Sequence, residues 1–227
     1  MTTRKRTLLS WSSGKDSAWA LHLLRQQPEI ELVGLFTTLN QRYDRVAMHA
    51  VRRTLLEQQA AAVGLPLEIL PIPDPCSNEE YAQVMTDFVR RCQQQQISHM
   101  AFGDLYLEDI RSYREQQLAA SGITTLFPLW GLPTEQLSRT MLAAGVEAYL
   151  TSVDPRRVPA AWAGQRWSLE LLATAPAGVD PCGENGEFHS CVVNGPMFSQ
   201  PLRVTAGDVV HRDGFVFADL LPQSQEA

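Results

Sequence analysis

The stretch Leu8-Leu9-Ser10-Trp11-Ser12-Ser13-Gly14-Lys15-Asp16-Ser17 has the pattern of a short buried strand that turns directly into a helix. Leu8 and Leu9 form an apolar run, and apolar side chains recur at helical spacing between Ser17 and Leu24. The residues between these two segments are small enough to let the backbone approach a ligand closely. Because a helix start offers unpaired N–H groups and positive potential, we expect this turn to bind an anion such as pyrophosphate, with Lys15 adding a full charge.

This turn is not a Walker A loop, which would need a glycine where position 9 has leucine. It resembles the S-G-G-x-D-S loop of the PP-loop ATP pyrophosphatases, with Ser13 replacing a glycine of the commonest form. Those enzymes split ATP between its α- and β-phosphates. The alternative interpretation is a serine-rich turn that only caps a structural helix.

Length and composition indicate an ordinary globular protein. The chain has 227 residues, of which 44% are hydrophobic and 19% charged, so it can form one large domain or two modest ones. It contains no apolar run of about 18 residues, and its basic start is not followed by a secretory segment, so we expect a cytoplasmic protein with no membrane partner. The net charge of −6 disfavours nucleic acid as a partner and favours a small molecule or a protein.

The four cysteines, Cys76, Cys92, Cys182 and Cys191, show no C-x-x-C spacing. In a reducing cytosol we expect free thiols rather than disulfides. Cys182 and Cys191 flank His189 and could bind zinc, but no fourth ligand with the usual spacing accompanies them.

Strands and helices are predicted to alternate through the first half of the chain. After the first strand and helix, strands are expected at 31–37, 67–72, 97–102 and 124–127, and helices at 48–63, behind a capping box at 77–80, and at 109–120. Such alternation predicts a parallel five-stranded sheet with helices on both faces. The strand exits at 12–16, 37–40, 74–77 and 103–104 should then meet at one crevice.

The second half has a different pattern. Pro128 to Pro133 interrupts the alternation, which predicts one domain over 1–128 and a smaller α+β domain over 129–227. In the second domain we expect helices at 134–144 and 162–172 and a strand at 146–153. Hairpin turns are predicted at Asn194-Gly195 and Asp213-Gly214.

A second unusual stretch, Val179 to Ser190, places two carboxylates, an amide and an imidazole within six residues, at Glu184, Asn185, Glu187 and His189. Such side chains can supply oxygen ligands to Mg²⁺ or hydrogen bonds to a substrate amine or carboxylate. The alternative is a polar surface loop with turn glycines.

Four ordered motifs together are similar to the diphthine-ammonia ligase family, which belongs to the PP-loop branch of the adenine nucleotide α-hydrolase superfamily. They are S-S-G-K-D-S at 12–17, G-D-L-Y-L-E-D-I-R-S-Y-R-E at 103–115, F-P-L-W at 127–130 and G-E-N-G-E-F-H-S at 183–190. The resemblance covers nearly the whole chain from Leu8, and D-P-C-G-E-N-G-E-F-H from Asp180 looks like the bacterial members.

The resemblance implies a HUP-type, Rossmann-like nucleotide-binding domain followed by a substrate domain. It also implies ATP-dependent amidation with Mg²⁺: a carboxylate is adenylated, pyrophosphate leaves, and ammonia or an amine displaces AMP. The carboxylate belongs to a small molecule or a protein residue. Its identity, the nitrogen donor and the oligomeric state, including a homodimer, stay open.

The resemblance assigns roles residue by residue. Ser12, Ser13, Gly14, Lys15, Asp16 and Ser17 match the phosphate loop; Thr37, Gly103 and Asp104 join them at the nucleotide; Arg111, Arg114 and Glu115 match the central motif; and Glu184, Asn185, Glu187 and His189 match the substrate motif. Lys15 would neutralise charge on the departing pyrophosphate, and Asp16 would hold Mg²⁺. Glu184, Glu187 and His189 complete the predicted catalytic set.

Some of these assignments have structural alternatives. Arg111 or Arg114 would clamp a carboxylate or phosphate, but either arginine could instead form a plain helix ion pair. His189 would orient or deprotonate the amine. Alternatively, it is a structural histidine whose ring nitrogens only form hydrogen bonds within the protein.

Two other functions remain open at this point. One is a tRNA-modifying relative in which Cys76 carries sulfur, which the acidic charge and the lack of a paired cysteine motif disfavour. The other is a HUP-class sensor that binds ATP or AMP without turnover.

Overall fold

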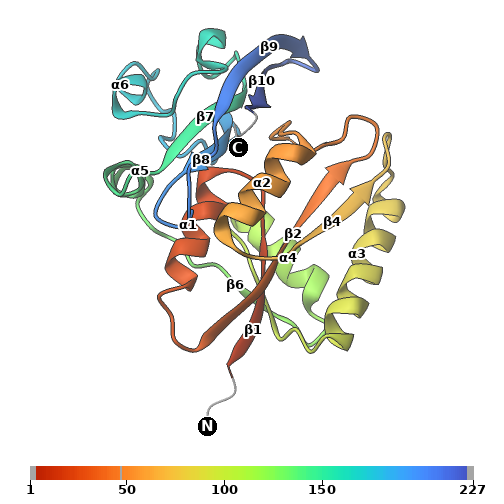
Figure 1. Cartoon of the computed structure of the whole chain (residues 1–227). Helices are drawn as coiled ribbons and strands as arrows, with labels where there is room; N and C mark the ends of the chain where they lie inside the picture. Colours follow the sequence, from red (N-terminus) through yellow and green to blue (C-terminus); the bar gives the residue numbers. More distant parts are fainter. Residues whose placement is uncertain (1–3, 47, 224–227) are drawn as a thin grey trace.

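The computed structural model describes residues 4–46 and 48–223. Its first sheet contains the five parallel strands predicted from the sequence (Figure 1). They are β1 (Lys5–Ser10), β2 (Ile30–Asn40), β4 (Leu67–Ile72), β5 (His99–Ala101) and β6 (Thr124–Leu126). The hydrogen-bonded order is β4-β2-β1-β5-β6, so the strand with the 12–17 turn lies at the centre of the sheet.

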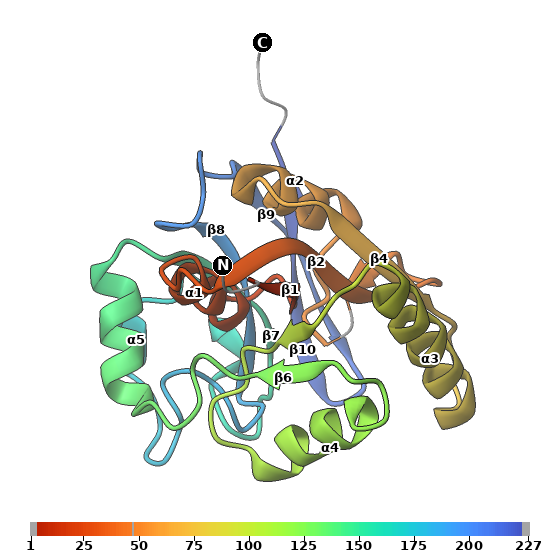
Figure 2. The same ribbon diagram turned by 90° about the horizontal axis from the view of Figure 1, so that it is seen from below.

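Helices cover both faces of this sheet, as predicted (Figure 2). They are α1 (Lys15–Leu24), α2 (Arg53–Val63), α3 (Asn78–Gln94) and α4 (Glu108–Leu118). Leu9 and Leu35 belong to the same buried cluster as α1 and α2, whereas Leu8 and Phe36 belong to the cluster that contains residues of α3 and α4. Neighbouring strand residues point to opposite faces, so each strand contributes to both cores.

The capping box at the start of α3 is confirmed. The Ser77 Oγ accepts the backbone N–H of Glu80 at 3.1 Å, and the Glu80 carboxylate accepts the backbone N–H of Ser77 at 2.8 Å. The predicted helical cap at Gly64 is also present, with a φ of +67° at the end of α2.

Two boundaries in this half were predicted wrongly. Strand β2 continues through Asn40 instead of ending at Thr37, because it pairs with β4 on one side and, near its end, with a short antiparallel strand β3 (Arg45–Val46). Helix α2 begins at Arg53 rather than near position 48, because Arg45 and Val46 pair with β2 and Arg52 forms a bridge with Arg45.

The second sheet is antiparallel, in the order β8-β7-β10-β9, and lies beside α1 and α2 (Figure 1). Its strands are β7 (Glu147–Val153), β8 (Phe188–Asn194), β9 (Val204–Arg212) and β10 (Phe215–Pro222), and α5 (Thr134–Ala143) precedes them. The turn at Asp213-Gly214 is confirmed, with positive φ at both residues. The hairpin predicted at Asn194-Gly195 is wrong, since β8 pairs with β7 rather than with the next strand along the chain.

The predicted helix at 162–172 is also wrong. The segment contains a short 3₁₀ helix, η1 (Ala160–Trp162), and one helical turn, α6 (Leu169–Leu172). Between them, the backbone N–H of Trp167 donates to the carbonyl of Ala148 at 2.8 Å, so this part runs extended beside β7. Trp167 is fully buried there. Tertiary pairing of this tryptophan outweighs the local helical pattern.

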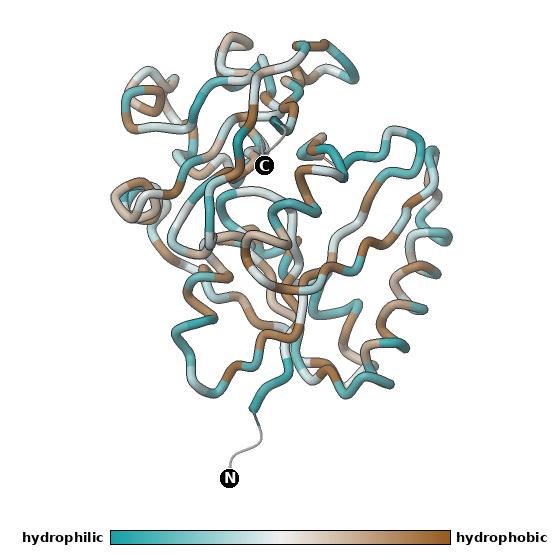
Figure 3. Tube along the Cα trace, in the orientation of Figure 1, coloured by the Kyte–Doolittle hydropathy of each residue, from teal (hydrophilic) through white to brown (hydrophobic). Residues whose placement is uncertain are grey.

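The two sheets share one hydrophobic core. A single buried cluster joins residues of α1 and α2, such as Leu21 and Leu56, with residues of β7, β8 and β10, such as Leu150 and Val192. Figure 3 shows hydrophobic stretches along the strands of the first sheet and hydrophilic ones at the outer loops. The domain limits 1–128 and 129–227 stay a prediction. Within the described residues, no helix is long and apolar enough to cross a membrane.

Candidate active site

The 12–17 loop joins the end of β1 to the start of α1. Ser13 adopts a φ of +67°, in the left-handed region that favours glycine, and this turns the chain sharply into the helix. Its carbonyl accepts the N–H of Val192 at 2.9 Å and the side-chain amide of Gln59 at 3.1 Å. Gly14 is the N-cap residue of α1 and has no side chain to satisfy the first N–H groups. The loop is therefore rigidly held and presents helix N–H groups, as an anion site requires.

A crevice of about 450 Å³ lies at the carboxyl ends of β1, β2 and β5. Its size is typical of small-molecule pockets. The predicted site residues that line it are Ser12, Lys15, Asp16, Ser17, Thr37, Gly103, Asp104, Arg114, Glu184 and His189. Three of the four predicted strand exits thus meet here. The exit at 74–77 does not, since Asp74 lines a separate hollow with Tyr43.

Lys15 is buried in the crevice wall, with 2% of its surface exposed. Its Nζ donates to both carboxylate oxygens of Asp16, at 2.8 and 3.1 Å, and to the carbonyl of Cys182. The ammonium also lies over the rings of Trp167 and Phe188, at 5.4 and 5.5 Å from their centroids. Burial alone would lower the pKa of Lys15, but Asp16 and other nearby acidic groups outweigh it and raise that pKa. The lysine therefore stays charged.

Gly103 allows the crevice to close tightly. A Cβ at this position would come within 3.0 Å of the backbone N of Ser17 and 3.1 Å of the carbonyl carbon of Asp16. A residue with a side chain at position 103 would require the first turn of α1 to shift by a few tenths of an ångström.

The two predicted arginines take different positions. Arg114 forms a bidentate pair with Asp104, at 2.5 and 3.2 Å, and its guanidinium lies over the ring of Phe102 at 4.5 Å. Both partners line the crevice, so the Arg114 guanidinium is held in a fixed orientation beside it. Arg111 instead pairs with Glu115 one turn along α4, at 2.8 Å. Neither Arg111 nor Glu115 belongs to the crevice lining among the described residues.

Glu184 comes from the segment before β8 and reaches the crevice from the second sheet. Its Oε1 accepts the backbone N–H of Leu105 at 2.8 Å. Burial raises the pKa of Glu184 to about 7, and the nearby carboxylates of Asp16 and Asp104 act in the same direction. A carboxyl that titrates near neutral pH can exchange protons with a reacting group.

Glu187 and Asn185 face their own loop rather than the crevice. The Glu187 Oε1 accepts the backbone N–H of Asp180 at 3.2 Å and the side-chain amide of Asn185 at 3.1 Å. Glu187 is fully buried, and among the described residues its Oε2 has no hydrogen-bond partner. Their predicted roles in substrate binding and catalysis stay predictions, whereas the observed contacts brace the loop that carries Glu184.

His189 lines the crevice next to a histidine that the sequence analysis missed. The rings of His189 and His49 lie 4.7 Å apart, and His49 Nδ1 donates to the carbonyl of Ser190 at 2.9 Å. Burial lowers the pKa of His189 to about 3 and that of His49 to about 4, so both imidazoles are neutral. The sequence did not single out His49 as a site residue, because it lies at the start of the segment 48–63, whose apolar spacing predicts a helix.

Asp180 was missed as well. It is only 7% exposed, accepts the Tyr106 hydroxyl at 2.8 Å, and accepts the backbone N–H of Cys182 at 2.9 Å. It therefore shapes the turn that brings the Cys182 carbonyl to Lys15. The quoted sequence stretch contained Asp180, but nothing in its spacing distinguished a bracing carboxylate from a reactive one.

The zinc alternative finds no support in the geometry. The Cys182 thiol donates to the carbonyl of Thr134 at 3.5 Å, and Cys191 is fully buried near Gln59. Burial raises the pKa of Cys191 to about 12, so it is a neutral thiol. Residues 4–46 and 48–223 contain no group of three or more metal-binding side chains.

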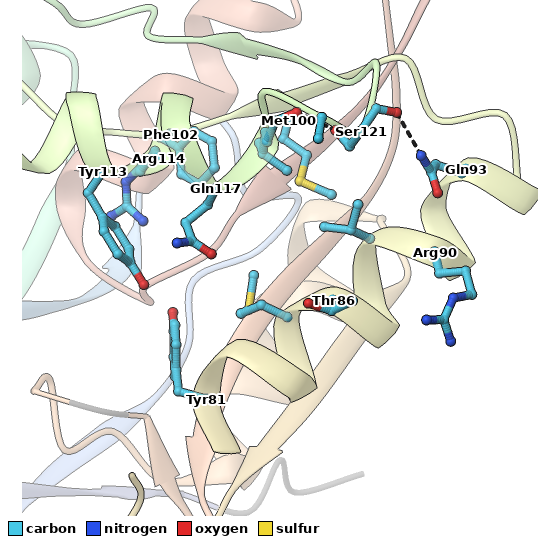
Figure 4. Close-up of a pocket in the computed structure, with 14 residues that line it drawn as sticks. Tyr81, Thr86, Arg90, Gln93, Met100, Phe102, Tyr113, Arg114, Gln117 and Ser121 are labelled. Carbon is cyan, nitrogen blue, oxygen red and sulfur yellow. Dashed lines mark hydrogen bonds between the residues drawn. The ribbon is translucent and has the colours of Figure 1, made fainter. Parts of the chain in front are cut away.

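A second hollow of about 290 Å³ lies between α3 and α4 and adjoins the crevice. The two share the side chains of Tyr81, Met85, Phe102 and Arg114. Figure 4 shows the hydroxyls of Tyr81 and Tyr113 turned toward each other near Arg114. The crevice is thus widened on the side where Arg114 lies.

Comparison with known proteins supplies the family. One family model, the diphthamide synthase N-terminal domain, matches residues 5–125, and a second, the diphthamide synthase C-terminal domain, matches residues 133–218. The chain belongs to the diphthamide synthase family. This confirms the resemblance seen in the four motifs, while the likeness to bacterial members stays a prediction.

Two curated relatives cover most of the chain. A diphthine–ammonia ligase of Rattus norvegicus is 23% identical over 191 residues, which is 78% of this chain and 70% of the relative. A diphthine–ammonia ligase of Bos taurus is 22% identical over 233 residues, covering 91% of this chain and 85% of the relative.

Proposed function

We propose that this protein is an ATP-dependent ligase. It adenylates a substrate carboxylate with release of pyrophosphate, and then amidates it with ammonia or an amine. The observation that carries the proposal is the meeting of three groups at one crevice: the 12–17 loop, the Asp104–Arg114 pair and Glu184. Membership of the diphthamide synthase family and the names of the two relatives support the same chemistry.

The 12–17 loop would hold the phosphates of ATP. Its helix N–H groups and the charged Lys15 neutralise the negative charge that builds on the departing pyrophosphate. Lys15 is fixed by Asp16 and Cys182 before any substrate arrives, so little reorganisation is needed during the reaction.

Asp16 suits Mg²⁺ that arrives with ATP. Mg²⁺ keeps several waters and usually takes only one or two protein carboxylates together with substrate phosphates, and Asp16 is such a single carboxylate on the crevice wall. Bound Mg²⁺ would neutralise phosphate charge there.

Arg114 and Glu184 would act on the second substrate. Arg114 offers a planar set of N–H donors to the substrate carboxylate, because Asp104 and Phe102 fix its guanidinium. When the amine nitrogen attacks the acyl carbon, its bond to that carbon forms and it loses a proton, which the Glu184 carboxylate accepts. The bond from the acyl carbon to the AMP oxygen then breaks, and AMP leaves.

The tRNA-modifying alternative is not favoured. The Cys76 thiol donates to the carbonyl of Ser77 at 3.3 Å, and among the described residues Cys76 is not part of the crevice lining. A sulfur carrier would be expected beside the nucleotide, whereas Cys76 lies outside this lining. The sensor alternative differs in predicting bound nucleotide without turnover.

Exchange of labelled pyrophosphate into ATP tests the proposal. The protein, Mg²⁺, ATP and fractions of a cell extract are incubated without added amine. Adenylation of a carboxylate predicts exchange in the fraction that contains the substrate, and loss of exchange in Lys15→Ala. Tight ATP binding without exchange in any fraction would favour the sensor instead.

A further inference from the structure

His49 lies directly against the start of α1. A Cβ added to Gly14 would come within 2.8 Å of the His49 Cε1 and 3.2 Å of the carbonyl oxygen of Ser190. Gly14 is the N-cap of α1, and His49 lines the crevice together with Lys15 and Asp16 from the first turn of that helix. The imidazole is therefore next to the place where the phosphates of ATP would bind, although it comes from a segment far along the chain.

The backbone around His49 is held in an unfavourable conformation. Met48 and Ala50, its two neighbours, have φ values of +61° and +55°. Non-glycine residues in this region cost free energy and persist only where the surroundings enforce them, most often at functional sites. Two hydrogen bonds enforce it here. The Arg45 guanidinium donates to the carbonyl of Ala50 at 2.8 Å, and the Ala50 N–H donates to the carbonyl of Val46 at 2.9 Å.

The second sheet anchors the same segment. Asp219 on β10 accepts two hydrogen bonds from Arg45, at 2.8 and 3.0 Å, and further bonds from Arg52. These arginines flank the residues that carry His49 on both sides. The position of His49 over the loop is thus fixed from β10 and from Ser190 on β8.

We propose that His49 contacts the β- and γ-phosphates of ATP. Its position is set by the ion pairs of Asp219 with Arg45 and Arg52, here called the Asp219 clamp. This proposal rests on the proposed ATP-binding function. In the free protein, Nδ1 donates to Ser190, which leaves Nε2 as an acceptor. Bound phosphates favour the imidazolium form, which takes one proton from solvent and donates from Nε2 to phosphate while Nδ1 keeps Ser190.

The charged groups facing His49 are consistent with this role. Lys15 on α1 and the neutral His189 on β8 face it across the crevice, and Lys15 contributes to keeping His49 neutral while the site is empty. Arg45 and Arg52, on its own side, share the one carboxylate of Asp219, which compensates one of their two positive charges. Burial is the main factor that lowers the pKa of His49, and Lys15 adds to it. A bound polyphosphate would compensate the positive charges of Lys15 and of the arginines, and so favour protonation of His49.

Calorimetric titration of the whole chain with ATP, pyrophosphate and AMP, each in the presence of Mg²⁺, tests the proposal. His49→Ala should lower the affinity for ATP and for pyrophosphate about tenfold, which is the scale of one hydrogen bond to a charged group. The affinity for AMP should fall less than about twofold. His49→Gln, which keeps a donor for Ser190, should show the same selectivity if His49→Ala folds poorly. His211→Ala, on the exposed part of β9, is the matched control and should bind all three ligands as the wild type does.

The possible outcomes separate the two proposals. Wild-type protein that binds neither ATP nor pyrophosphate contradicts the proposed function itself. The wild type could instead bind ATP while both His49 variants lose affinity for ATP and AMP equally, or lose affinity for neither. Either result overturns the phosphate contact and leaves the proposed function standing.

Discussion

Glu184 lies in an environment unlike that of an ordinary surface carboxylate. Its pKa is raised from 4.5 to about 7, mainly by burial. Both the proposed reaction and the stability of the protein should therefore depend on its charge.

Glu184→Gln should remove amide formation while leaving ATP binding within about twofold, because Gln cannot accept the amine proton. In the wild type, amidation should rise with pH through about 7, as the carboxylate form appears. A rate profile between pH 5.5 and 8.5 measures this. Glu79→Gln, on the exposed first turn of α3, is the control, and an unchanged profile in Glu184→Gln would rule out the base role.

The same substitution has a stability consequence with a defined sign. Since the folded pKa of Glu184 lies above the unfolded one, its ionisation opposes folding increasingly as pH rises from about 4.5 to about 7. Glu184→Gln should thus stabilise the protein at pH 8 by about 1 to 2 kcal/mol more than at pH 4. This is less than the roughly 3 kcal/mol of the full pKa shift, because the carboxyl is partly exposed. Denaturant unfolding at the two pH values checks the difference.

Ser13 carries a side chain in a conformation that favours glycine. Ser13 has a φ of +67° and is fully buried. Ser13→Gly should change the free energy of unfolding by less than about 1 kcal/mol, because the lost contacts and the relieved strain offset each other. Ser13→Val should cost about 2 kcal/mol or more, since a β-branched residue fits this region poorly. Equal stability of the two variants, measured by urea unfolding, would argue against strain at this position.

Sequence motifs identified most residue types at the site but not their directions. Lys15 and Asp104 meet at the crevice as predicted, because they follow strands whose ends the topology brings to one edge. The sequence left open whether the 183–190 segment closes over the 12–17 loop, and Glu184 lines the same crevice. Glu187 carries the same carboxylate as Glu184 but turns inward to the backbone of Asp180. Spacing alone does not encode which way a loop side chain turns.

At the scale of elements, local signals predicted those parts whose stability is local. The capping box and apolar spacing placed α3 correctly, and the apolar runs placed β4. The extended stretch at Trp167 was missed because it depends on backbone pairing with β7. Strand β3 pairs with the nearby end of β2, but its two residues are too few to show a strand pattern. His49 was missed because its segment has helical spacing, whereas side-chain bonds from Arg45 and Arg52 to Asp219 on β10 hold that segment in place.

The clamp between β3 and β10 should stabilise the protein in a pH-dependent way. Burial opposes ionisation of Asp219, but the Arg45 and Arg52 guanidiniums lower its pKa to about 2. Because the folded pKa is below the unfolded one, this contribution is complete above about pH 4 and is lost as pH falls toward 2.

Asp219→Asn should cost about 1 kcal/mol at pH 7, a value reduced because both arginines are partly exposed to solvent. At pH 2 the variant and the wild type should be nearly equal in stability. Chemical unfolding at both pH values tests this, with Glu68→Gln, which breaks the surface pair with Arg91, as the control. A cost at pH 2 as large as at pH 7 would exclude an ionic clamp.

At the scale of the whole molecule, the 12–17 loop depends on the second sheet. Val192 donates to Ser13, the Ser190 Oγ accepts the N–H of Lys15 at 3.2 Å, and the Cys182 carbonyl accepts the Lys15 ammonium. The parallel sheet could be predicted from the alternation of strands and helices. This dependence could not, because the contacts join residues about 180 positions apart.

Residues 1–128 expressed alone should not bind ATP with the affinity of the whole chain. The truncation exposes the face of α1 and α2 that now packs on β7, β8 and β10, so we expect aggregation or a loosely packed state. Size-exclusion chromatography and ATP titration measure both properties. A monomeric, cooperatively folding fragment with full ATP affinity would show that the loop is autonomous.

The central claim is that ATP is cleaved between its α- and β-phosphates to amidate a carboxylate. The most direct measurement incubates the protein with Mg²⁺, α-labelled ATP and fractions of a cell extract, each with and without [¹⁵N]ammonium. The account predicts labelled AMP in one fraction, formed in quantity only with ammonium, together with a product that carries ¹⁵N. Labelled ADP, or ATP that stays bound and unaltered in every fraction, would contradict it.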